Sequence, residues 1–170
     1  GRRMMRALCE TRPNLKRDPY TRDQFPRLYD EYEANLRSSN ALDFDDLLSA
    51  AVALLRTSEE ARMFYTQKWR HVLVDEFQDT SLSQYELIRT LAAESARVFV
   101  VGDVDQAIYS WRGAEVANIR TKFDSDFAGA GTVLLTKNYR STATIVKAAQ
   151  AVIGESRDRS PLELDAVQPG

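Results

Sequence analysis

Two adjacent carboxylates, Asp75 and Glu76, lie at the end of the short β-branched run 71–75. Such a run predicts a buried strand, and in open α/β sheets ligands bind at the carboxyl ends of the strands. At that place one carboxylate could hold a magnesium ion beside a nucleotide, while the other takes a proton from an attacking water. The alternative is that the acidic pair is only a solvated turn after the strand.

A second group of candidate residues follows the next β-branched run, 97–101. Gly102 permits a sharp exit from the strand, and Gln106 can donate a hydrogen bond to a phosphate oxygen or position a water. Bases stack on aromatic and guanidinium faces, at about 1–3 kcal/mol per base. The same loop offers three such faces: Tyr109, Trp111 and Arg112. The alternative is a loop whose Trp and Tyr pack into the core.

The third group is the segment 138–141, Asn-Tyr-Arg-Ser, which follows the apolar run 132–135. An exposed Tyr139 could stack on an adenine, and Arg140 could reach a γ-phosphate. An arginine that acts on transition-state phosphate charge contributes about 10³–10⁵ in rate. Alternatively, Ser141 is a helix N-cap, a role that can coexist with a phosphate contact.

Periodicity and capping patterns predict the elements that must position these residues. The predicted helices cover 28–37, 43–56 with Asp43 as N-cap, 59–69, 81–93 with a capping box from Ser81 to Gln84, 116–123 and 141–153. The predicted strands are 71–75, 97–101 and 132–135. Because these strands are apolar without alternation, we expect burial on both faces, as in a parallel sheet. Strand, helix and strand over 71–101 predict a βαβ unit.

The ends of the chain carry fewer signals. Residues 1–27 are rich in arginine and broken by Pro13, Pro19 and Pro26, which predicts short helices and turns at most. The tail after Gly154 is polar, and we predict no regular structure for it.

Composition limits the function classes. The chain has 170 residues, about one domain, with 23 Lys and Arg against 25 Asp and Glu, so any nucleic-acid contact must be local. Residues 1–27 carry a net charge of +5, and the remainder carries −7. One cysteine and one histidine exclude a disulfide framework and a Cys/His zinc cluster. The longest apolar run, 47–55, is far shorter than the roughly 20 residues of a membrane helix, so we expect no membrane contact.

Three stretches, taken together, resemble known motifs. They are Val-Asp-Glu-Phe-Gln-Asp-Thr at 74–80, Val-Gly-Asp-Val-Asp-Gln-Ala-Ile-Tyr-Ser-Trp-Arg-Gly-Ala at 101–114, and Leu-x-x-Asn-Tyr-Arg-Ser-Thr at 135–142. In order and spacing they are similar to motifs II, III and IV of superfamily 1A DNA helicases of the UvrD/PcrA/Rep type. The segment 40–48 also resembles the sequence that precedes motif II in that family, and the resemblance covers about residues 28–153.

The resemblance implies a role for each matching position. Asp75 would hold Mg²⁺, Glu76 would be the base that activates the hydrolytic water, and Gln106 would sense the γ-phosphate of ATP. Other positions would contact nucleotide or DNA. Tyr139 would stack on the adenine, Arg140 would be the arginine finger, Tyr109 and Trp111 would stack on bases of single-stranded DNA with Arg112 beside them, and Phe44 would touch DNA or pack in the core.

The resemblance also implies an α/β fold. The chain would be part of a RecA-like P-loop NTPase motor, a parallel sheet with flanking helices preceded by a helical insertion. Residues 1–56 would end the insertion, 57–135 would form the second half of the first motor domain, and 136–170 would begin the second motor domain. ATP and Mg²⁺ would be the cofactors. Single-stranded DNA and its junctions with duplex DNA would be the partners. The protein would be located in a bacterial cytoplasm near the nucleoid, or in an organelle or nucleus.

The implied function is 3′-to-5′ ATP-dependent translocation and unwinding of DNA in repair or replication. Two other possibilities stay open at this point. One is a non-catalytic remnant that binds nucleic acid or a partner protein, although Asp75, Glu76, Gln106 and Arg140 are all retained. The other is a nuclease-linked helicase of the same superfamily.

The phosphate-cradling motif Gly-x-x-x-x-Gly-Lys-Ser/Thr occurs nowhere in the 170 residues. We therefore expect the isolated chain neither to hydrolyse ATP nor to unwind DNA, and we expect its unpaired sheet edge to favour aggregation. The check is an ATPase assay on the purified chain and its Glu76→Gln variant. Turnover that disappears in the variant would contradict this expectation.

Overall fold

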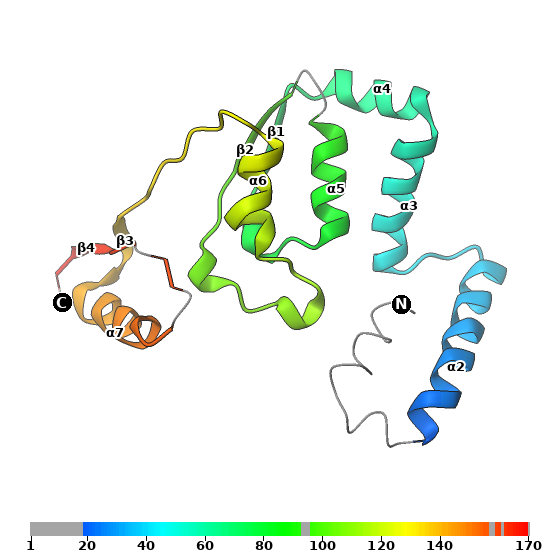
Figure 1. The fold of residues 1–170 in the computed structure, drawn as a ribbon, viewed down its shortest axis with the longest axis horizontal. Helices are drawn as coiled ribbons and strands as arrows, with labels where there is room; N and C mark the ends of the chain where they lie inside the picture. Colours follow the sequence, from blue (N-terminus) through cyan, green and yellow to red (C-terminus); the bar gives the residue numbers. More distant parts are fainter. Residues whose placement is uncertain (1–18, 93–95, 157–158, 161, 170) are drawn as a thin grey trace. The chain divides into compact units, whose positions relative to one another are not determined.

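A computed structural model describes residues 19–92, 96–156, 159–160 and 162–169, with side chains described from residue 26 onward. The chain divides into two compact units, residues 1–50 and 51–170, and each is considered by itself. Figure 1 shows the order of the helices and strands.

The described part of the first unit begins with α2, Pro19–Ser38. The predicted helix 28–37 is confirmed, but the expectation of only short helices and turns up to residue 27 is wrong for residues 19–27, because α2 continues through Pro26. A proline inside a helix lacks the N–H of one backbone hydrogen bond and its ring crowds the carbonyl four residues earlier, yet the turns on both sides of Pro26 stay helical. Pro13 and the rest of residues 1–18 lie outside the described residues.

Helix α3, Phe44–Thr57, has the predicted N-cap. The Asp43 carboxylate accepts the Asp46 amide at 2.8 Å, and the Asp46 carboxylate accepts the Asp43 amide at 3.3 Å, a reciprocal cap. The Tyr32 hydroxyl donates to the other Asp43 oxygen at 2.9 Å. The Asp46 amide, followed by the Tyr32 hydroxyl, stabilises the carboxylate form and lowers the pKa of Asp43.

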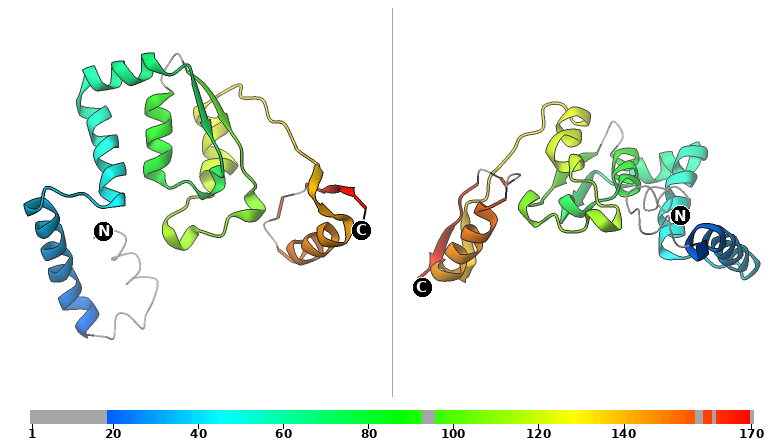
Figure 2. Two further views of the ribbon diagram at one scale, coloured as in Figure 1. Left: turned by 180° about the vertical axis from the view of Figure 1, so that it is seen from behind. Right: turned by 60° about the horizontal axis from the view of Figure 1, so that its bottom comes forward.

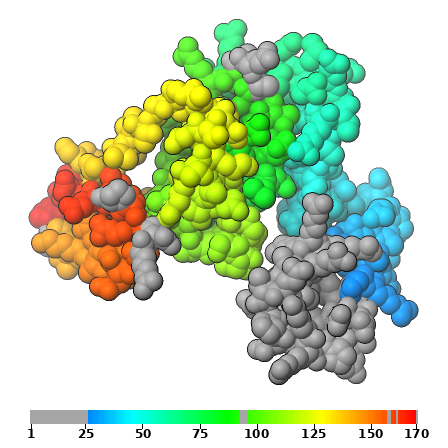
Figure 3. All heavy atoms as spheres, in the orientation of Figure 1, coloured from blue at the N-terminus to red at the C-terminus, as the bar shows by residue number. Residues whose placement is uncertain are grey.

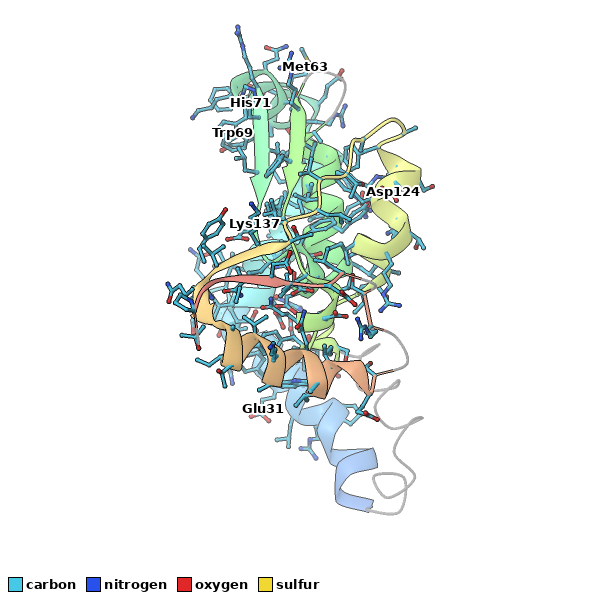
Figure 4. All side chains as sticks on the ribbon, turned by 90° about the vertical axis from the view of Figure 1, so that its left-hand side faces the viewer. Glu31, Met63, Trp69, His71, Asp124 and Lys137 are labelled. Carbon is cyan, nitrogen blue, oxygen red and sulfur yellow. The ribbon has the colours of Figure 1, made fainter. Side chains whose placement is uncertain are left out.

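The second unit contains the predicted βαβ unit. After α4, Glu59–Lys68, strand β1, His71–Val74, is followed by α5, Leu82–Leu91, and by β2, Arg97–Val100. The two strands pair in parallel, with His71 opposite Arg97 and Val74 opposite Val100. Figure 4 labels Trp69 and His71 at the entry to β1, so the strand runs from there to the edge that carries Asp75.

One face of this strand pair is covered. Phe77, Tyr85 and Ile88 form the buried centre, and the apolar side chains packed on it are Val72, Val74, Val98, Val100, Ile119 and Phe123. Burial raises the pKa of the Tyr85 hydroxyl, which also donates to Asp126 at 2.9 Å. Figures 1 and 2 show α5 and α6 beside the strands that they cover.

The other face is open. Leu73 is 73% exposed and Phe99 is 61% exposed, so the expectation of burial on both faces is wrong for the described chain. The physical reason is that the described side chains packed on β1 and β2, from segments 77–88 and 119–123, lie against the valine face. A parallel sheet is buried on both faces only where helices cover both.

The segment after β2 forms short turns before the next helix. The turns are η2 (Val104–Gln106), η3 (Ser110–Arg112) and the π-helical turn η4 (Asn118–Lys122). Helix α6 (Phe123–Asp126) follows η4 directly. The predicted helix over 116–123 therefore begins as a π turn. Ser81 and Ala114 form an isolated antiparallel bridge, and the Glu115 amide donates to the Thr80 carbonyl at 3.0 Å. These bonds hold the far end of the loop against the start of α5.

The predicted third strand, 132–135, is wrong. This segment has no strand structure, and its apolar side chains Val133, Leu134 and Leu135 are exposed. A strand needs the backbone groups of a neighbour, and none of the described strands pairs with this segment. Figure 3 shows it in yellow on the molecular surface.

The end of the chain forms a second parallel pair. Strand β3, Lys137–Thr142, is followed by α7, Ala143–Gly154, and by β4, Asp165–Gln168, which pairs with β3. Two predictions are corrected here. Ser141 lies in β3, and the N-cap of α7 is Thr142, whose side chain makes no capping bond. The tail after Gly154 is partly ordered, because β4 finds a backbone partner in β3.

Within the described ranges, no helix combines the length and the apolar character needed to cross a membrane.

The capping box of α5 gives a stability test. The Gln84 amide donates to the Ser81 hydroxyl at 3.3 Å, and the Ser81 amide donates to the Gln84 carboxamide at 2.8 Å. Ser81→Ala should lower the free energy of unfolding by about 1 kcal/mol, measured by urea denaturation. Ser83→Ala, the same change at an exposed position two residues further on, should stay within about 0.5 kcal/mol of wild type. Equal effects of the two substitutions would contradict the capping assignment.

Candidate functional site

The candidate site lies where β1 and β2 end side by side. The Val101 amide donates to the Val74 carbonyl at 2.8 Å, and the Phe77 amide donates to the Val101 carbonyl at 2.9 Å. These two bonds extend the ladder past the strands and place Asp75 and Glu76 beside Val101 and Gly102. The two groups of polar residues that the sequence predicts at strand ends therefore share one edge of the sheet.

Glu76 has an unusual backbone conformation. Its φ of 50° and ψ of 43° lie in the left-handed region, where a residue with a Cβ is uncommon. Its amide donates to the Asp75 carboxylate at 2.9 Å, and its carbonyl accepts the Asp79 amide at 2.9 Å. Both carboxylates are exposed. Backbone strain of this kind costs of order 1–3 kcal/mol and is concentrated at functional sites.

The left-handed residue turns the chain into η1, Phe77–Asp79. Phe77 packs in the apolar centre, and Gln78 is 1% exposed. The Gln78 carboxamide donates to the Glu76 carboxylate at 2.8 Å and, at 3.4 Å, to that of Asp79, and its oxygen accepts the Asp103 amide at 3.1 Å. One buried side chain thus joins the end of β1 to the end of β2.

Gly102 makes this approach possible. A Cβ added there would lie 2.7 Å from the Gln78 Oε1 atom and 2.8 Å from Ile119 Cδ1. Both distances are shorter than real Cβ contacts, so one of the neighbouring side chains would have to move. Glycine at position 102 therefore serves close packing, whereas its φ lies outside the left-handed region, so the conformational freedom that the sequence predicts there is not used.

Asp103 continues the polar network to the predicted phosphate sensor. Its carboxylate accepts the Gln106 Nε2 at 2.8 Å and the Asp105 amide at 3.0 Å, which caps the short turn η2. Gln106 is exposed, so its carboxamide is accessible to a ligand at the sheet edge.

The predicted stacking residues gather on the next turn, η3. The ring centroids of Tyr109 and Trp111 lie 6.4 Å apart, and the Arg112 guanidinium carbon lies 5.7 Å from each of them. Trp111 is 68% exposed, so the alternative that it packs into the core is wrong for the described chain. Tyr109 and Arg112 are also exposed. This surface offers two aromatic faces and a cation to solvent.

Tyr139 and Arg140 lie on β3 with exposed side chains. The Asn138 carboxamide oxygen accepts the amides of Arg140 at 3.0 Å and Ser141 at 2.8 Å, which orders the backbone of this segment. Among the described residues, no hydrogen bond or ion pair joins Tyr139 or Arg140 to Asp75 or Glu76. The described chain therefore does not bring these two predicted groups together.

Phe44, at the start of α3 in the first unit, is 91% exposed. The alternative that it packs in a core is wrong for the described residues. Its contact with DNA stays a prediction.

The acidic edge fits a magnesium ion that is shared with a nucleotide. Mg²⁺ keeps several waters and binds through one or two carboxylates and substrate phosphates. Asp75 is exposed, and the ion pairs within the described ranges involve neither it nor Glu76 nor Asp103. No cluster of three or more His, Cys, Asp or Glu side chains in these ranges could hold a metal alone, so phosphate oxygens would have to complete the coordination.

Sequence reasoning missed two side chains of this site, Gln78 and Asp103. Both lie inside the quoted motifs, but no spacing rule tells a buried bridging glutamine from a solvated one. The available signal was the position of Gln78 two residues after Glu76, at the edge where a second strand was expected to end.

Comparison with known proteins gives the family. The UvrD/REP helicase N-terminal domain family matches residues 3–128. The ATP-dependent DNA helicase UvrD1 of Mycobacterium tuberculosis (strain ATCC 25618 / H37Rv) is 45% identical over 139 residues, covering 78% of this chain and 18% of that protein.

Two further relatives give the same picture. DNA helicase II of Rickettsia typhi (strain ATCC VR-144 / Wilmington) is 47% identical over 132 residues, covering 78% of this chain and 20% of that protein. The ATP-dependent DNA helicase PcrA of Staphylococcus aureus (strain Mu50 / ATCC 700699) is 42% identical over 134 residues, covering 79% of this chain and 18% of that protein. The chain spans about a fifth of the length of these relatives. The resemblance is confirmed: the chain belongs to the UvrD/REP helicase N-terminal domain family.

Proposed function

We propose that this chain is part of an ATP-dependent DNA helicase that moves 3′ to 5′ along single-stranded DNA, in repair or replication. The observation that carries the proposal is the shared edge where Asp75 and Glu76 at the end of β1 meet Gly102 and Asp103 at the end of β2. The names of the relatives support it, because they describe ATP-dependent DNA helicases.

At this edge Asp75 and Glu76 have different roles in ATP hydrolysis. The Asp75 carboxylate would hold magnesium, which would neutralise phosphate charge. Glu76 takes a proton from a water whose oxygen attacks the γ-phosphorus. As the new P–O bond forms, the bond from the γ-phosphorus to the β–γ bridging oxygen breaks, and ADP leaves with phosphate. Gln106 donates from its carboxamide to the γ-phosphate.

The remaining site residues bind the base of the nucleotide and the DNA. Tyr139 stacks on the adenine, and Arg140 stabilises charge on the transferred phosphoryl group. Tyr109, Trp111 and Arg112 stack on bases of the single strand, and Phe44 adds a contact. Because Gln106 and Trp111 lie on one loop, a phosphate-dependent movement of Gln106 changes the stacking surface. Single-stranded DNA and its junctions with duplex are the partners.

The architecture follows from the same proposal. Residues 1–56 form the end of a helical insertion, and residues 57–135 form the second half of a RecA-like motor domain. Residues 136–170 form the start of a second motor domain. The phosphate-cradling loop comes from sequence outside this chain. The protein works beside DNA, in the cytoplasm if its source is bacterial like the relatives above.

The test is the steady-state ATPase of the full-length protein with and without single-stranded DNA. Glu76→Gln should lower kcat at least about 100-fold, because loss of a general base costs about 10²–10⁴ in rate. Glu86→Gln is the matched control. Glu86 lies on α5 and pairs with Arg56 of α3 at 2.8 Å. Among the described residues, no hydrogen bond or ion pair joins Glu86 to Asp75, Glu76 or Asp103, so this variant should keep kcat within twofold of wild type.

Gln106→Ala should also lower the DNA-stimulated rate. A Glu76→Gln variant at half the wild-type rate or more would refute the assignment of the base. A wild-type protein without DNA-stimulated turnover would favour the non-catalytic alternative.

A further inference from the structure

We propose that Gln78 is a positioning residue that fixes the Glu76 carboxylate and couples it to the Gln106 loop. This inference rests on the proposed function. Gln78 would not touch ATP or water itself, because it is 1% exposed and both ends of its carboxamide are bound to protein.

The Gln78 side chain has the chemistry that a bridge between two strand ends requires. A carboxamide carries donors and an acceptor on one planar group, and this site uses both. Nε2 donates to the Glu76 carboxylate at 2.8 Å, and Oε1 accepts the Asp103 amide at 3.1 Å. A methionine of similar length offers neither bond, and a glutamate offers no donor when ionised.

The hydrogen bonds of Gln78 are part of a continuous chain from Glu76 to Gln106. Glu76 binds Gln78, Gln78 binds the Asp103 amide, and the Asp103 carboxylate binds Gln106 at 2.8 Å. Three hydrogen bonds therefore connect the proposed base to the proposed γ-phosphate sensor across the two strand ends. When Gln106 turns from Asp103 to a phosphate, Asp103 loses its hydrogen bond to Gln106. Because the Asp103 amide also binds Gln78, this change alters the position in which Gln78 holds the Glu76 carboxylate.

The backbone conformation of Glu76 also makes the bond from Gln78 important. Glu76 is held in the left-handed region, so its side chain leaves the chain in a direction that ordinary strand geometry would not give. The carboxylate is exposed and could adopt several rotamers. The 2.8 Å bond from Gln78 Nε2 restricts it to rotamers that keep this contact. A displacement of about 1 Å at a reacting group can cost about 10²-fold in rate.

The experiment measures kcat and KM for ATP in the full-length protein with saturating single-stranded DNA. Gln78→Met should lower kcat about 10- to 100-fold and change KM for ATP less than threefold, because the side chain positions the base without binding nucleotide. Thr80→Val is the matched control in the same turn. Thr80 is also buried, and its hydroxyl donates to the Phe77 carbonyl at 2.7 Å without reaching Glu76 or Asp103. It should lose thermal stability and keep kcat within twofold.

A second variant disturbs the same bridge from the other side. Gly102→Ala places a Cβ 2.7 Å from Oε1 and should displace the carboxamide, with a fall in kcat of the same order. Its control is Gly131→Ala, where nothing lies within 4 Å of the added Cβ. This variant keeps the test decisive even if Gln78→Met does not fold.

The outcomes separate this inference from the proposed function. An active wild type with kcat reduced in both bridge variants and retained in both controls supports the inference. An active wild type with kcat retained in a folded Gln78→Met or Gly102→Ala variant overturns it and leaves the proposed function intact. Equal losses of kcat in Thr80→Val would also overturn it, because a merely structural role would then suffice. A wild type without ATPase activity refutes the proposed function, and this inference with it.

Discussion

The parallel pairing of β1 with β2 determines where every candidate catalytic group of this edge lies. Because both strands run the same way, Asp75–Glu76 and Gly102–Asp103 leave the sheet at one edge, and two backbone bonds beyond the strands keep them adjacent. The packing of the four strand valines on Phe77, Tyr85 and Ile88 stabilises the pair from one side. The same turn that buries Phe77 also buries Gln78, so the core and the polar bridge depend on each other.

The open face of the strand pair bears on the proposal that the chain belongs to a longer motor protein. Leu73 and Phe99 are exposed on β1 and β2, and the apolar side chains of 133–135 are exposed on the segment that follows α6. Exposed apolar surface of this kind is typical of an interaction site. In the proposed helicase, further strands and helices of the first motor domain cover it, and 132–135 gains the neighbour that a strand requires.

Local signals predicted α3, α4, α5 and the first two strands to within two residues, because their causes lie within a few residues. Asp43 with Asp46 and Ser81 with Gln84 form the caps that the sequence indicates, and β-branched runs become β1 and β2. The errors concern partners. The run 132–135 has strand composition without a neighbour among the described residues, and the tail forms β4 only because β3 provides backbone groups. At the site, the acidic pair and the stacking residues were visible as motifs, whereas the role of Gln78 depends on a bond to Asp103, 25 residues away, that no local pattern encodes.

The most direct test of the central claim, that this edge is half of an ATP site, is a structure of the full-length protein with Mg²⁺, single-stranded DNA and a non-hydrolysable ATP analogue. We expect the metal at the Asp75 carboxylate and the γ-phosphate within hydrogen-bond distance of the Gln106 carboxamide. We also expect a water between Glu76 and the γ-phosphorus, with Gln78 still bound to Glu76. A nucleotide bound elsewhere, with Asp75 and Glu76 facing only solvent, would show that this part of the chain is not an ATP site.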